Sequence, residues 1–132
     1  MRVVRYFALV ALLLSGAAAA APPGPVVTTL MTQKLENEPG KEVLMLTVEY
    51  PPGGADPVHR HNAEALVYVL EGSIVMGVNG AKPVTLTAGQ TFHEGPDDIH
   101  TIGRNASDSK PAKLLAVFVA DSDDKILTTP VK

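Results

Sequence analysis

The chain has 132 residues, enough for one domain of modest size, and 14 acidic against 11 basic side chains give it a formal net charge of −3. Cysteine is absent, so disulfides are excluded and stability must come from packing, with help from a metal or a subunit interface. Lysine and arginine form no cluster, which argues against a nucleic-acid partner.

The N-terminus has the features of a secretory signal peptide. Arg2 and Arg5 precede an apolar run at residues 6–14, and the alanines at 17–21 supply a cleavage site. The apolar run is too short for a membrane anchor. We therefore expect residues 1–20 to be removed, the mature chain to be periplasmic or secreted, and no membrane to be a partner after cleavage.

Beyond residue 25 the sequence is typical of an all-β domain. Short apolar or β-branched runs recur between Gly, Pro, Asn and Asp residues, and helical periodicity is hard to find. The predicted strands are residues 26–35, 43–50, 65–70, 73–78, 84–87, 91–94, 100–104 and 112–120. This spacing predicts a jelly-roll sandwich or barrel over residues 43–120. A segment at 21–42 with the first strand precedes it, and a polar tail at 121–132 follows.

Two of the four histidines, His59 and His61, stand one residue apart just before the strand predicted at 65–70. Residues two apart in an extended strand project to the same face, so the two imidazoles point together. Neutral imidazole is a common ligand for divalent ions of the first transition row. Alone, such a pair in a Pro-rich loop is more often exposed. A third histidine after a turn, His100, is what a facial metal site on a β-barrel requires.

These residues resemble the two sequence motifs of the cupin family. The positions that keep the family spacing are Gly53, His59, His61 and Gly72 in the first motif, and Gly89 and His100 in the second. The departures are Pro96, displaced by one residue, Asp97 in place of a glycine, and Asn105, one residue late. The resemblance covers residues 43–120. It implies an all-β cupin barrel, a double-stranded β-helix or jelly roll, with a divalent transition metal (Fe, Mn, Ni or Zn) on its three motif histidines.

One ligand of the family is missing, because the carboxylate expected at position 65 is replaced by Ala65. Three ways to complete the site are open. Glu64 reaches the ion through a tightened connection, Glu94 reaches it from the facing strand, or water completes a three-histidine site. A one-residue slip on a strand sends a side chain to the opposite face, which counts against Glu64.

Our working assignment takes Glu64 as a metal ligand beside the three histidines and Glu94 as the catalytic acid–base residue. Strand alternation allows only one of His93 and Glu94 to face the interior. An inward Glu94 is costly without a cation, which makes its position informative.

The resemblance implies a small-molecule ligand and a repertoire of oxygen insertion, decarboxylation, isomerisation or lyase chemistry on small oxygenated molecules. Fold resemblance does not select among these reactions. The alternative is a non-enzymatic periplasmic module that binds a ligand or a metal without turnover, an interpretation that the missing carboxylate favours. We also expect a homodimer, because the strand at 26–35 is able to extend a neighbour's sheet.

Overall fold

The structure, a computed structural model, describes residues 19–124 and 128–132, so nearly all of the expected signal peptide lies outside the described residues. Every strand or helix assigned within those ranges is a β-strand. No helix there has the length and hydropathy to cross a membrane. The prediction of an all-β fold is confirmed.

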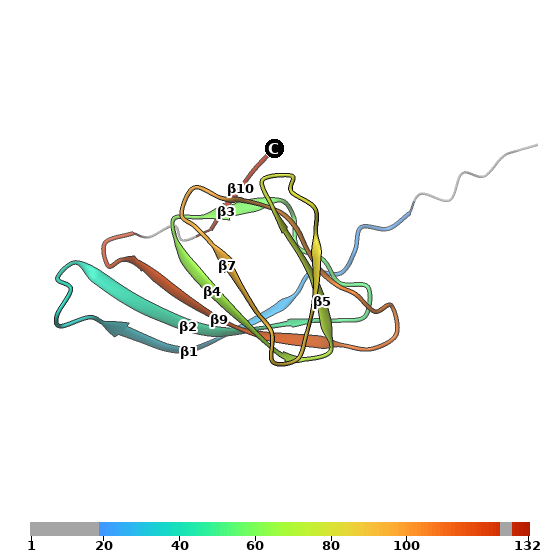
Figure 1. The fold of residues 1–132 in the computed structure, drawn as a ribbon, viewed down its shortest axis with the longest axis horizontal. Helices are drawn as coiled ribbons and strands as arrows, with labels where there is room; N and C mark the ends of the chain where they lie inside the picture. Colours follow the sequence, from blue (N-terminus) through green and yellow to red (C-terminus); the bar gives the residue numbers. More distant parts are fainter. Residues whose placement is uncertain (1–18, 125–127) are drawn as a thin grey trace, which may run out of the picture.

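The strands form two five-stranded antiparallel sheets around a common interior (Figure 1). The first sheet has the order β1 (Val26–Lys34), β2 (Lys41–Tyr50), β9 (Ala112–Asp121), β4 (Ala63–Glu71) and β7 (Thr91–Glu94). The second has the order β10 (Thr128–Pro130), β3 (His59–His61), β8 (Ile99–Asn105), β5 (Ser73–Val78) and β6 (Val84–Thr87). Along β4 and β9 every second residue is buried, so each strand turns one face to the interior.

The interior is filled by aliphatic and aromatic side chains from both sheets. Val69 and Ile74 are fully buried, and each such burial contributes about 1.5–3 kcal/mol. Small residues occupy other inward positions of β4 and β9, among them Ala65 and Ala116. These short side chains leave part of the interior unfilled, and both line a cavity there.

Two short strands were missed by the sequence prediction. β3 contains the His59–His61 pair and lies between β10 and β8, with His59 directly opposite His100. β10 comes from the polar tail at 121–132, for which no strand was predicted. Instead Thr128 pairs with His61, and this end of the tail forms an edge strand of the second sheet.

Two tight turns depend on glycines with positive φ angles. Asn79 (φ 53°) and Gly80 (φ 70°) join β5 to β6, as the Asn-Gly signal for a hairpin predicts. Gly72 (φ 70°) joins β4 to β5, and a Cβ atom there would lie 2.8 Å from the carbonyl oxygen of Pro111. A Cβ at Gly80 would meet nothing within 4 Å.

We predict that Gly72→Ala and Gly80→Ala differ in their cost. Both place a non-glycine residue in the left-handed region, which costs about 1–2 kcal/mol. Only Gly72→Ala adds a clash with backbone, which raises its loss to about 2–4 kcal/mol. Urea denaturation followed by circular dichroism measures both. Equal losses would show that the packing at Pro111 adds nothing.

Candidate metal centre

Three histidines and one carboxylate converge on the interior. One ligand atom from each of His59, His61, Glu94 and His100 lies within 4.8 Å of the others. The two-residue repeat of β3 turns His59 and His61 inward and leaves Arg60 exposed. His100 comes from β8 beside them, and Glu94 is the last residue of β7 in the other sheet. The cluster therefore spans both sheets.

Hydrogen bonds behind the imidazoles orient them. His59 donates from Nδ1 to the carbonyl oxygen of Pro57 at 2.8 Å. A carbonyl oxygen only accepts hydrogen bonds, so the neutral imidazole of His59 has its proton on Nδ1. Its Nε2 therefore has a free lone pair that faces the cluster. Nδ1 of His61 lies 3.0 Å from Oγ1 of Thr128. Nε2 of His59 then lies 3.1 Å from Nε2 of His61 and 3.3 Å from Nδ1 of His100. Metal-ligating histidines commonly have such second partners.

The residues present fit a divalent transition metal. Two ligands held at about 2.1 Å from one ion lie roughly 3.0–3.4 Å apart in octahedral or tetrahedral geometry. The nitrogen–nitrogen distances match this spacing, and Oε2 of Glu94 lies 3.5 Å from Nδ1 of His100. Among the described residues, Oε2 of Glu94 and Nε2 of His100 are buried without a hydrogen-bond partner. A buried carboxylate oxygen without a partner is costly, and a cation removes that cost.

Glu94 supplies a carboxylate next to the position where the cupin motif lacks one. Ala65 and Glu94 are directly opposite each other in the β4–β7 pair. Side chains opposite each other on one face of a sheet are neighbours. Ala65 is too small to fill the space beside it, and Glu94, only 3% exposed, turns into the same interior.

The assignment of Glu64 as a ligand does not fit this geometry and is corrected. Glu64 lies on the outer face of β4, and its Oε2 is 2.5 Å from Nε2 of His93. His93 points outward from β7 while Glu94 points inward, as strand alternation requires. The one-residue offset from position 65 turns Glu64 away from the three histidines.

Burial sets the protonation of the cluster. Burial, together with the negative charges of Asp56 and Asp98, raises the pKa of Glu94 to about 7. Burial also lowers the pKa of His100 to about 4, helped by repulsion from His59. Both shifts favour the uncharged forms, and a bound cation would reverse the preference for Glu94.

A second polar pair lies beside the cluster and was missed from the sequence. Tyr50, 2% exposed, donates its hydroxyl hydrogen to Oδ2 of Asp56. Burial raises the pKa of both groups. A Cβ on Gly103 would lie 2.7 Å from both Asp56 Oδ2 and Cε1 of His100, so the carboxylate and the imidazole meet over the same glycine. The only sequence signal was an acidic residue three positions before His59.

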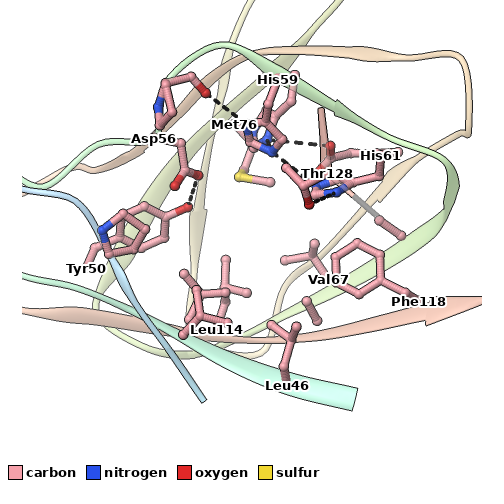
Figure 2. A pocket seen from close by; sticks show the side chains of 18 of the residues that line it. Leu46, Tyr50, Asp56, His59, His61, Val67, Met76, Leu114, Phe118 and Thr128 are labelled. Atoms are coloured by element: carbon pink, nitrogen blue, oxygen red, sulfur yellow. Dashed lines mark hydrogen bonds and ion pairs between the residues drawn. The ribbon is translucent and has the colours of Figure 1, made fainter. Parts of the chain in front are cut away.

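These groups face a cavity of about 220 Å³. Figure 2 shows His59 and His61 at one side of it, and Tyr50 with Asp56 at another. Other labelled side chains of the wall are Leu46, Val67, Met76, Leu114 and Phe118. The ionisable side chains therefore lie at the edge of a cavity whose other walls are mostly apolar.

Residues 46–118, more than half of the chain, match the profile of the Cupin domain family. This chain is a cupin. It is 32% identical over 100 residues to germin-like protein 5-1 of Oryza sativa subsp. japonica, an alignment that covers 72% of this cupin and 44% of the relative. The chain thus spans less than half the length of that curated relative.

Solved structures have the same fold. A Klebsiella pneumoniae protein with a double-stranded β-helix domain superposes with a TM-score of 0.63 at 16% identity, over 86% of this cupin and 90% of that chain. Oxalate oxidase in complex with the substrate analogue glycolate gives a TM-score of 0.62 at 24% identity, over 92% of this cupin and 63% of that chain. These likenesses confirm the cupin jelly roll.

We predict that Glu94→Gln stabilises the metal-free protein at high pH. The pKa of about 7 in the folded state lies above the ordinary 4.5, so ionisation of Glu94 weakens the fold as the pH rises between these values. Glutamine does not ionise. With chelator present, the variant should exceed the parent by about 1–3 kcal/mol at pH 8 and match it at pH 4.5. Urea denaturation at both pH values measures this, and a pH-independent difference would contradict it.

Proposed function

We propose that this cupin binds one divalent transition metal through His59, His61, His100 and Glu94. The observation that supports this is the convergence of four donors, together with a buried carboxylate oxygen among them, Oε2 of Glu94, that has no hydrogen-bond partner. Imidazole and carboxylate together suit Fe(II), Mn(II), Ni(II) and Zn(II), so the donor set does not select one of these ions.

The proposed role of the site is to bind and transform a small oxygenated molecule in the adjoining cavity. A bound ion supplies Lewis acidity or, with a redox-active metal, electron transfer. The chain's own residues position the site, because Pro57 fixes the tautomer of His59. Most side chains of the cavity wall are apolar and offer water few hydrogen-bond partners.

Proton transfer falls to a different residue from the one first assigned. As a ligand, Glu94 is not free to act as the general base. Asp56 borders the cavity and is already hydrogen-bonded to Tyr50. The Tyr50–Asp56 pair is therefore the better placed group to accept or return a proton.

A second candidate is a module that captures a ligand or a metal without turnover. The wall of the cavity supports it, since most of its residues are apolar and offer few groups for chemistry. The names of the relatives, a germin-like protein and an oxalate oxidase, are compatible with binding or catalysis here. Loss of a measured turnover on removal of the metal would favour the enzyme.

Location and assembly are also proposals. The features of residues 1–20 support export, and β1 supports a homodimer. All nine residues of β1 are exposed, and among the described residues it pairs only with β2. Such a free edge is suited to pairing with a second copy.

We predict that the protein, expressed with each of the four ions and purified without chelator, contains about one equivalent of at least one of them. His100→Ala and Glu94→Ala should each lower the metal affinity by at least about tenfold, because each removes a donor. Mass spectrometry of the elements and competition with a fluorescent chelator measure both quantities.

The outer face supplies matched controls for these variants. His93→Ala and Glu64→Ala delete the same side-chain types from an exposed pair and should keep the parent's affinity. A parent free of every ion would overturn the proposed function. Equal losses in the inner and outer variants would refute the assignment of ligands.

A further inference from the structure

Among the described residues, histidine is the only basic residue type in the wall of the cavity. Of the described residues that line it, none is lysine or arginine, and most are aliphatic or aromatic. Its ionisable groups are Tyr50, Asp56 and the metal cluster itself. The described part of the wall thus offers an anion one cationic partner, the bound ion, and mostly apolar surface elsewhere.

The charges of the loaded site limit what enters. Metal-bound imidazoles add no charge, so a divalent ion with ionised Glu94 leaves one net positive charge at the ion, and the carboxyl group of Asp56 brings only negative charge to the same cavity. One anionic head group balances it. A second carboxylate on the same ligand would lie against apolar wall or near Asp56, without a cation to offset its desolvation.

The volume of the cavity limits the size of the ligand. An apolar cavity of about 150 Å³ holds benzene, so the 220 Å³ found here accommodates a body slightly larger than one aromatic ring together with its head group. Val67, Leu114 and Phe118 provide apolar contact for that body.

We propose that the cavity selects small molecules with one anionic oxygen head and an apolar body, and discriminates against a second anionic group. The inference rests on the proposed metal site. It separates this cupin from its structural neighbour oxalate oxidase, because oxalate is a dianion without an apolar body.

Two α-hydroxy acids form a matched pair of probes. α-Hydroxyisocaproate and malate have the same head group and the same number of non-hydrogen atoms, but an isopropyl group in one replaces a carboxylate in the other. Calorimetric titration of the metal-loaded protein should show α-hydroxyisocaproate binding at least about tenfold more tightly than malate.

A positive charge added where the cavity opens to solvent tests whether the lack of a second cation causes the discrimination. Val27 lines the cavity and is 56% exposed, so Val27→Lys should fold and should improve malate binding by about threefold or more. Thr28→Lys adds the same charge to the opposite face of β1 and should leave the ratio of the two affinities unchanged.

The outcomes are separable by metal analysis of the same sample. A loaded protein that binds malate as tightly as α-hydroxyisocaproate overturns the ligand class and leaves the metal site intact. An equal effect of Val27→Lys and Thr28→Lys also overturns it, since general charge would then explain the change. A protein that loads no ion overturns the proposed function and this inference together.

Discussion

The burial of the Glu94 carboxylate is the constraint on which the rest of the site depends. A carboxylate in the interior requires a positive partner or a proton, and burial raises the pKa of Glu94 to about 7, which favours the protonated form when no cation is bound. The neighbouring strands leave room for this carboxylate. Ala65 leaves space on the facing strand, and the outward turn of His93 is the geometric counterpart of the inward turn of Glu94.

Two of the histidines of the site, His59 and His61, depend on very short strands for their position. His59 and His61 lie on a three-residue strand whose neighbours are β8 and the tail strand β10. Thr128 of β10 contacts the imidazole of His61. Residues near the C-terminus therefore help to orient a group that lies almost seventy positions earlier in the chain.

Much of the fold was accessible from the sequence, because alternation of apolar residues and turn signals are local properties. The inward direction of His59 and His61 follows from the two-residue repeat of a strand in the same way. The sequence left Glu64, Glu94 and water open as ways to complete the site, because the position of Glu94 opposite Ala65 depends on the register between β4 and β7. The Tyr50–Asp56 contact depends on the path of a loop, and a strand as short as β10 contains no detectable period.

The register of β7 also has a consequence for how such a site changes over time. Because Glu94 and His93 are adjacent on one strand, a slip of β7 by a single residue would exchange them between interior and surface. The donor set would then consist of four imidazoles. A change in the length of the turn before Thr91 is one route to such a slip, so the donor set of this barrel could change without any amino-acid substitution in β7.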